Sequence, residues 1–217
     1  LVRVEVHFLL QTHLREQLLR MRGDLCVDLL FAGLVVRLLF GQQLAGKHDV
    51  LPGRVLREQI EILKNAGVDL IVAETMINIE ETLAAVDAAS TVCQLPIMCT
   101  MTVDADGSIF SGGNAIEAAV SLEAAGADAV GVNCSVGPDQ LISVIRNIRE
   151  NVSIPVIAKP NAGMPFIDDQ GNAVYSMKAP DFAKHIKALI DVGAGIVGGC
   201  CGTTPEYIKE VATILER

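Results

Sequence analysis

The sequence predicts a barrel of parallel β-strands and α-helices, the α/β class known as the (β/α)8 or TIM barrel, incomplete or divergent at its N-terminal end. Strands read as continuous apolar runs, which is typical of parallel strands covered by helices. No Gly-x-Gly-x-x-Gly turn follows an early strand, so an open doubly wound sheet is less favoured. Five βα units are expected, with strands at 68–74, 96–102, 128–134, 154–160 and 195–199.

Helices are predicted between these strands from the spacing of their apolar residues. The first begins at Arg54 and ends at Asn65, just before Gly67. Further helices are expected at 77–90, 114–127, 137–150, 180–194 and 204–217. The longer insertion after the fourth strand predicts a small hairpin that turns at Asp169-Gln170-Gly171.

The first 53 residues do not follow this rhythm. They are rich in Leu and Arg and lack clear turn residues. Three more βα units would need more chain than this, because one βαβ unit takes about 30 residues. We therefore divide the chain into a divergent N-terminal segment, 1–53, and a barrel portion, 54–217, and we expect the front of the barrel to be missing, shortened or replaced.

Composition excludes several classes of partner. The net charge of −9 leaves no basic patch, so we expect no binding to nucleic acid or to an anionic membrane. The longest apolar run, 25–40, is shorter than the roughly 20 residues that cross a bilayer, and no signal peptide is recognisable. We expect a cytoplasmic protein, in which the six cysteines are reduced, metal-bound or catalytic rather than disulfide-bonded.

Polar and sulfur-containing residues gather where the predicted strands end. In a barrel the carboxyl ends of the strands share one face, and that face holds the active site. Convergence of all five units is stronger than any single residue as an indication of a site. The residues are Glu74; Thr100, Met101 and Thr102; Asn133 and Cys134; Lys159, Pro160 and Asn161; and Cys200 and Cys201.

Three cysteines belong to this set, namely Cys134, Cys200 and Cys201. Three thiolates suit zinc, and an open fourth position would make the site catalytic. The glycines around the adjacent pair allow the sharp turn that would bring both side chains to one ion. Two alternatives stay open: Cys134 is a small buried packing residue, or the adjacent pair forms a strained disulfide. Cys93 and Cys99 are predicted to be packing residues.

Four other residues at the strand ends are candidates for a role in the site. Glu74 either binds a substrate ammonium or pairs within the protein. Asn133 and Asn161 either hydrogen-bond a substrate carboxylate or hold loops in place. Lys159 is a candidate Schiff-base lysine, the basis of an alternative function as a lyase.

Four stretches carry a resemblance to the homocysteine S-methyltransferase family: AETM (73–76), GVNCS (131–135), PNAGMP (160–165) and GGCCGTTPEYI (198–208). The spelling IAKPNAGMP is most similar to the homocysteine-binding module of cobalamin-dependent methionine synthases. The resemblance implies a (β/α)8 barrel with zinc held by the cysteines that match Cys134, Cys200 and Cys201. It also implies that Glu74 binds the amino group of homocysteine and that Asn133 lies in the same pocket.

The function expected from this resemblance is zinc-dependent transfer of a methyl group to the homocysteine thiol, which gives methionine. The favoured donor is methylcobalamin, supplied by the 5-methyltetrahydrofolate route and carried on another domain or protein; betaine and S-methylmethionine are alternatives. The family's Asp-Gly-Ala-Met-Gly segment near the start is not found here. An inactive truncated barrel therefore stays a further alternative.

Overall fold

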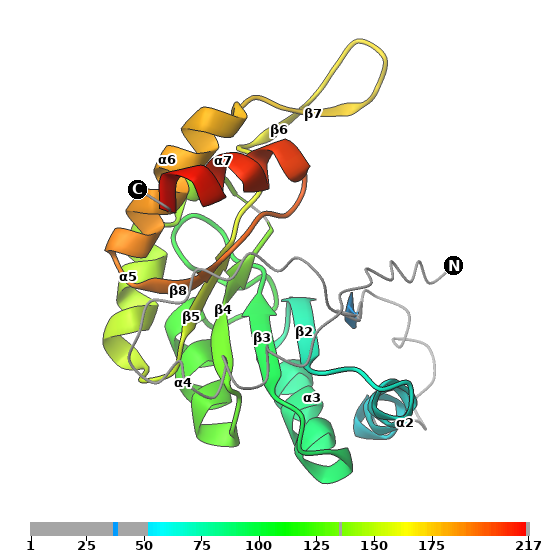
Figure 1. Ribbon diagram of the computed structural model, residues 1–217. Helices are drawn as coiled ribbons and strands as arrows, with labels where there is room; N and C mark the ends of the chain where they lie inside the picture. Colours follow the sequence, from blue (N-terminus) through cyan, green and yellow to red (C-terminus); the bar gives the residue numbers. More distant parts are fainter. Residues whose placement is uncertain (1–36, 39–51, 135, 216–217) are drawn as a thin grey trace.

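One parallel sheet is the centre of the computed structural model, which describes residues 37–38, 52–134 and 136–215. Its strands lie side by side in the order in which they occur along the chain (Figure 1). A doubly wound sheet would reverse its strand order at a switch point, whereas a barrel adds each strand beside the previous one. The strands are β1 (Arg37–Leu38), β2 (Ile71–Met76), β3 (Ile97–Met101), β4 (Ala129–Asn133), β5 (Val156–Lys159) and β8 (Ala194–Val197).

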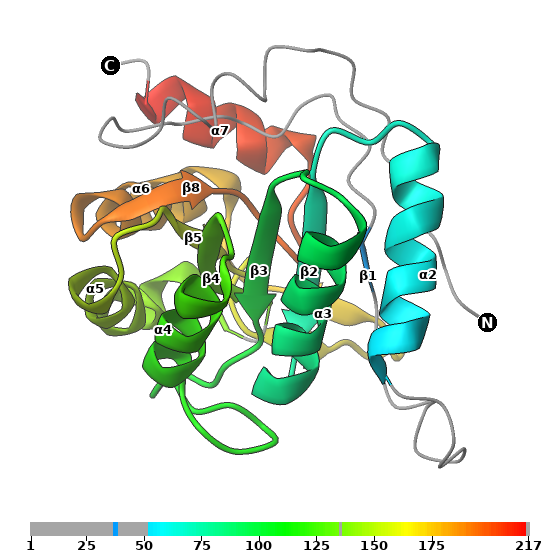
Figure 2. The same cartoon turned by 90° about the horizontal axis from the view of Figure 1, so that it is seen from below.

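Helices connect these strands, and consecutive helices contact one another from α2 to α7. Figure 2 shows α3, α4 and α5 side by side along one face of the sheet. The predicted helix at 137–150 is divided, because a 3-10 turn, η1 (Pro138–Gln140), ends before the α-helix begins. The α-helices are α2 (Pro52–Asn65), α3 (Ile79–Val92), α4 (Ala115–Ala125), α5 (Ile142–Asn151), α6 (Ala179–Asp191) and α7 (Pro205–Leu215).

The starts of two helices follow from single residues. Asn78 accepts a hydrogen bond from the Glu81 backbone N–H at the start of α3. Asn114 and Glu117 form a reciprocal capping box at the start of α4. Both arrangements satisfy backbone N–H groups that have no partner within the helix.

The two faces of the sheet bury different sets of residues. Alternate strand residues such as Ile71, Ala73 and Cys99 pack with the helices in the main core. The residues between them form a second, smaller apolar cluster on the opposite face, here called the inner face. Its members are Leu70, Val72, Met98, Ala129, Ile157 and Ile196. This arrangement matches a barrel wall, with helices outside and a layer of side chains inside.

Strand β1 was not predicted from the sequence. It pairs in parallel with β2, with Arg37 opposite Val72, and it lies within the segment that we treat as divergent. Among the described residues β1 and β8 are the two edges of the sheet and do not pair with each other. The predicted domain boundary at residue 53 stays a prediction, since most of segment 1–53 lies outside the described residues.

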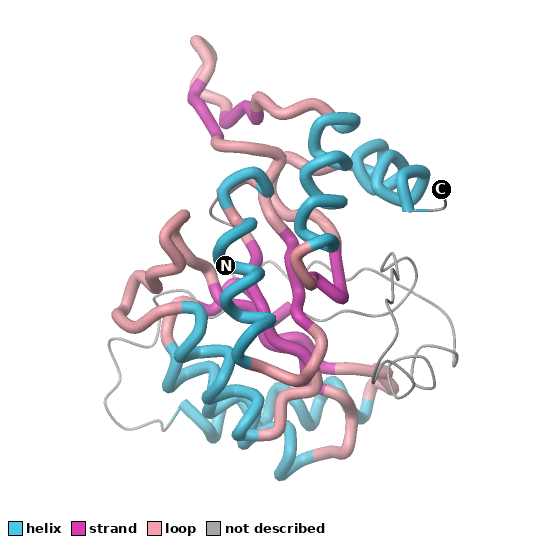
Figure 3. Tube along the Cα trace, turned by 90° about the vertical axis from the view of Figure 1, so that its left-hand side faces the viewer, coloured by secondary structure: helices cyan, strands magenta, loops and turns pink. Residues whose placement is uncertain are grey.

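The predicted hairpin is confirmed as β6 (Pro165–Ile167) and β7 (Ala173–Tyr175), joined by a turn at Asp168–Asn172. Figure 3 shows this arm extending away from the sheet. It returns to the barrel at Met177, whose N–H donates to the carbonyl of Ala162. No helix in the described part of the chain has the length and apolar character to span a membrane.

Substitution of Phe182 in α6 tests how much the packing of helices on the outside of the barrel contributes to stability. Its side chain is fully buried, and its ring meets the edge of Tyr207 of α7 at 5.5 Å between centroids. We expect Phe182→Ala to lower the free energy of unfolding by about 3–5 kcal/mol, through lost burial and a cavity. Urea denaturation measures it, and Ile62→Ala, at an exposed α2 position, should stay within about 0.5 kcal/mol of wild type.

Candidate metal centre

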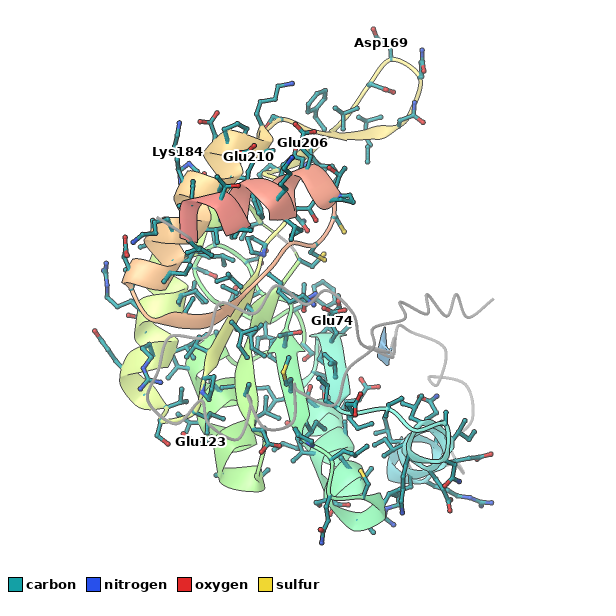
Figure 4. The ribbon with its side chains drawn as sticks, in the orientation of Figure 1. Glu74, Glu123, Asp169, Lys184, Glu206 and Glu210 are labelled. Carbon is teal, nitrogen blue, oxygen red and sulfur yellow. The ribbon has the colours of Figure 1, made fainter. Side chains whose placement is uncertain are left out.

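A polar layer lies directly above the apolar layer of the inner face, at the carboxyl ends of the strands. The two-residue repeat places Glu74 beyond Val72 and Lys159 beyond Ile157. Asn133 ends β4 on the same face, directly opposite Lys159. Figure 4 shows Glu74 at this end of β2. The predicted convergence of β2, β4 and β5 is therefore found in the structure.

The sulfur atoms of Cys134, Cys200 and Cys201 lie within 4.8 Å of one another beside this polar layer. Cys134 Sγ is 3.7 Å from Cys201 Sγ, and Cys200 Sγ is 4.0 Å from Cys201 Sγ. No other group of three or more potential ligands of this kind occurs among the described residues. Cys99 is fully buried in the outer core, as predicted for a packing residue.

The spacing of the three sulfurs fits a zinc ion. Tetrahedral zinc with Zn–S bonds of about 2.3 Å holds its sulfur ligands roughly 3.8 Å apart. The observed separations of 3.7 and 4.0 Å lie on either side of that value. Thiolate is also the ligand that selects zinc over the harder cations magnesium and calcium. The donor set therefore suits zinc.

Backbone hydrogen bonds bring β4 and the loop after β8 together at this point. Cys134 has a left-handed backbone, with φ of +65°, and its N–H donates to the Lys159 carbonyl. Cys200 N–H donates to the carbonyl of Pro160. The last residue of β5 and the residue that follows it thus contact the cysteines of both neighbouring units, which fixes the distance between those units.

Asn161 completes this link. Its side-chain oxygen accepts a hydrogen bond from Cys201 N–H at 3.0 Å, and the Cys201 carbonyl accepts one from Ala162 N–H. Asn161 is 3% exposed. Of the two readings of this residue, the structure therefore supports the one in which it holds a loop.

Gly202 is required by both its conformation and its neighbour. Its φ is +79°, and a Cβ built on it would lie 2.3 Å from Cγ of Tyr175. The Tyr175 ring, at the end of β7, thus packs against the residue that follows Cys201. Sequence reasoning missed Tyr175 because its only local context is an exposed hairpin, and the contact joins residues far apart along the chain.

Asn133 connects β2 to the cysteines. Its side-chain oxygen accepts from Thr75 N–H at 2.9 Å, and its amide donates to Thr75 Oγ1 at 2.8 Å and to Cys200 Sγ at 3.7 Å. Thr75 has a φ of +61°, an unfavourable value for a β-branched residue. These hydrogen bonds hold that conformation. A direct contact between Asn133 and substrate stays a prediction.

Hydrogen bonding also prepares one thiol for ionisation. A hydrogen bond from Cys134, and a weaker one from Asn133, lowers the pKa of Cys200 to about 6, against the opposing effects of burial and of the Glu74 charge. The pKa of Cys99 shifts in the other direction, because burial raises it to about 12. Burial and the nearby cysteines likewise raise the pKa of Tyr175. The Cys200 thiol is thus chemically distinct from the packing cysteine Cys99.

Glu74 and Lys159 form an ion pair across the inner face. Their side chains are only 9% and 16% exposed. The ion pair engages the Lys159 nitrogen within the protein, and the Schiff-base alternative stays a prediction. The Glu74 carboxylate lies in the polar layer beside the cysteines, where the sequence predicted a group that binds ammonium.

Gly202 allows a test of how the loop after β8 supports the metal. We expect Gly202→Ala to weaken zinc binding at least tenfold, because the added methyl group collides with Tyr175 and moves Cys201. Gly171→Ala is the matched control, since Gly171 has a φ of +81° but open space around it. Both changes carry the conformational cost of about 1–2 kcal/mol. Competition with a chromogenic chelator measures zinc affinity, and equal losses in both variants would contradict the account.

Asn133 allows a second test, made without metal. We expect Asn133→Ala to lower the free energy of unfolding of zinc-free protein by about 1–3 kcal/mol, because partly buried polar groups of Thr75 lose their hydrogen bonds. Asn151→Ala removes an exposed hydrogen bond to the Asn147 carbonyl on α5 and should change stability by less than about 0.5 kcal/mol. Chemical denaturation compares the two, and an unchanged Asn133→Ala protein would refute the supporting role.

The chain is similar in sequence to mycobacterial methionine synthases. The chain is 31% identical over 159 residues to a methionine synthase of Mycobacterium leprae, a match that covers 70% of this chain and 13% of that protein. It is 32% identical over 154 residues to a methionine synthase of Mycobacterium tuberculosis, covering 68% of this chain and 13% of that protein. The matched region is therefore a small part of these relatives.

Solved structures share the fold. The apo form of the homocysteine methyltransferase MmuM from Escherichia coli superposes with a TM-score of 0.60 at 19% identity, covering 77% of this chain and 59% of that chain. Its metallated form gives 0.60 at 20% identity, covering 77% and 54%. These likenesses confirm the predicted barrel fold. The family profile described as homocysteine S-methyltransferase matches residues 53–215. The chain therefore belongs to the homocysteine S-methyltransferase family.

Proposed function

We propose that this chain binds zinc through Cys134, Cys200 and Cys201 and transfers a methyl group to the thiol of homocysteine, giving methionine. The observation that carries the proposal is the cluster of three sulfurs at the carboxyl ends of parallel strands, spaced as a tetrahedral ion requires. Family membership supports the same reaction class.

The chemistry needs a thiolate at neutral pH, whereas a free thiol has a pKa near 8.5. Zinc, when bound, supplies a positive charge that favours the thiolate form of a coordinated thiol. The chain's own residues would supply three of the four ligands of a tetrahedral ion, and the substrate thiol would take the fourth position. During transfer a sulfur–carbon bond forms, the bond from the methyl carbon to its donor breaks, and the thiol proton passes to solvent.

Glu74 is the residue proposed to bind the substrate ammonium. It is a buried carboxylate in the polar layer, and its partner Lys159 lies opposite Asn133, which donates to Cys200 Sγ. An ammonium bound there would orient the substrate so that its thiol points to the cysteine cluster. Such fixed orientation is a main source of catalytic rate.

Methylcobalamin is the proposed donor, recharged by the 5-methyltetrahydrofolate route and held on another domain or protein. The methionine synthase relatives support this choice, and the chain spans about one eighth of their length. Betaine and S-methylmethionine are the competing donors. We also propose a cytoplasmic location, because the reaction needs reduced thiols.

The zinc content of the protein tests whether the three cysteines bind the metal. We expect one zinc per wild-type chain and at least a hundredfold weaker binding after Cys134→Ser, Cys200→Ser or Cys201→Ser, since each change removes a thiolate ligand. Cys93→Ser, on the helix side of the sheet, is the control and should keep full zinc. Atomic absorption after dialysis gives the stoichiometry. A folded wild-type protein that binds no zinc with its thiols reduced would refute the function and favour an inactive barrel.

The donor is tested separately. Purified zinc-loaded protein is mixed with homocysteine in three parallel reactions, which contain methylcobalamin, S-methylmethionine or betaine as the methyl donor. The methionine formed in each reaction is measured by mass spectrometry. We expect methionine with methylcobalamin, accompanied by the spectral change of the demethylated corrinoid. Methionine formed only from S-methylmethionine or betaine would replace the proposed donor but leave the zinc chemistry in place.

A further inference from the structure

The ion pair between Glu74 and Lys159 raises a question that the proposed function does not answer. Lys159 is 16% exposed at its side chain, and its stem lies against Gly198, where a Cβ would stand 3.4 Å from Lys159 Cγ. Its ammonium pairs with Glu74. If a substrate ammonium takes Glu74, this largely enclosed cation loses its partner, and a charge left unpaired in such surroundings is destabilising.

We propose that Lys159 binds the α-carboxylate of the substrate, so that the Glu74–Lys159 pair together forms a receptor for an amino-acid zwitterion. The inference rests on the proposed function and extends it to substrate recognition. The substrate bears its ammonium and carboxylate on one carbon. A zwitterion placed against the pair gives Glu74 a new cation and Lys159 a new anion, and no buried charge is left alone.

The position of Lys159 relative to the cysteines supports this role. Lys159 lies opposite Asn133 in the β4–β5 register, and Asn133 donates to Cys200 Sγ. The Lys159 carbonyl accepts from Cys134 N–H. The ammonium of Lys159 is therefore attached to the same short segment that positions the metal ligands. Two methylene groups separate the thiol of homocysteine from its α-carbon, so one molecule is suited to contact both places.

Thr100 adds an independent observation at the same face. The two-residue repeat places it beyond Met98 on the inner face, in register with Gly131. It is 1% exposed, and its hydroxyl has no hydrogen-bond partner among the described residues. Buried hydroxyls are normally satisfied, and bound ligands are one way to satisfy them. A polar substrate group above Thr100 would supply the missing partner.

Binding of three thiols tests the proposal. Homocysteine, 3-mercaptopropylamine without the carboxylate, and 4-mercaptobutanoate without the ammonium are titrated by calorimetry into zinc-loaded wild type, Lys159→Met, Lys159→Arg and Lys184→Met. Lys184 is an exposed α6 lysine paired with Asp181, and its change is the control. None of these changes touches a cysteine, so every variant should keep its zinc. The zinc content of each protein is measured to verify this. The double variant Glu74→Gln/Lys159→Met avoids an unpaired buried carboxylate if the single variant folds poorly.

We expect wild type and Lys184→Met to bind homocysteine about 10- to 100-fold more tightly than 3-mercaptopropylamine, the value of a charge-assisted carboxylate contact. Lys159→Met should bind the two within about threefold, with homocysteine weakened and the amine unchanged. Lys159→Arg should keep much of the preference. The double variant should bind all three thiols about equally.

Two results would overturn the inference. Lys159→Met or the double variant that still prefers homocysteine over 3-mercaptopropylamine shows that Lys159 does not bind the carboxylate. Equal weakening of every thiol by Lys159→Met shows a purely structural role. A third result, wild-type protein that binds zinc but none of the thiols, would contradict the proposed function as well as the inference.

Discussion

The stretch 159–161, the last residue of β5 and the two that follow it, is the constraint on which the site depends. Its backbone accepts hydrogen bonds from Cys134 and Cys200, and the Asn161 side chain accepts one from Cys201. These contacts join the ends of two strands that are not neighbours in the sheet, because β5 lies between β4 and β8. A metal site of three sulfurs that lie within 4.8 Å of one another needs this fixed separation. Strand pairing in the barrel sets this separation, and the hydrogen bonds of the loops adjust the positions of the sulfurs.

Charge is distributed to match that arrangement. The cluster brings three potential anions together, and Glu74 adds a fourth nearby. Lys159 pairs with Glu74 and Asn133 donates to Cys200, so both charged side chains of the polar layer and the Asn133 amide have partners before any ligand binds. Polar groups arranged in advance in this way need little reorganisation during a reaction, which is the main advantage of a protein site over water.

Sequence pattern predicted the barrel units, the hairpin and the gathering of cysteines, because each rests on local periodicity or on the shared edge of parallel strands. Strand β1 escaped prediction, since two residues of pairing within an apolar segment leave no periodic trace. The Glu74–Lys159 pair and the Tyr175–Gly202 contact also escaped it. They depend on side chains from distant parts of the chain meeting in space, which residue type alone does not encode.

The central claim is that three cysteines of this chain hold zinc and leave a fourth position for the substrate thiol. Zinc X-ray absorption spectroscopy tests it most directly, because it counts the sulfur atoms around the ion. The account predicts three sulfurs in the zinc-loaded protein and four after homocysteine is added, at about 2.3 Å. A count of two or fewer without substrate, or a count that homocysteine leaves unchanged, would contradict it.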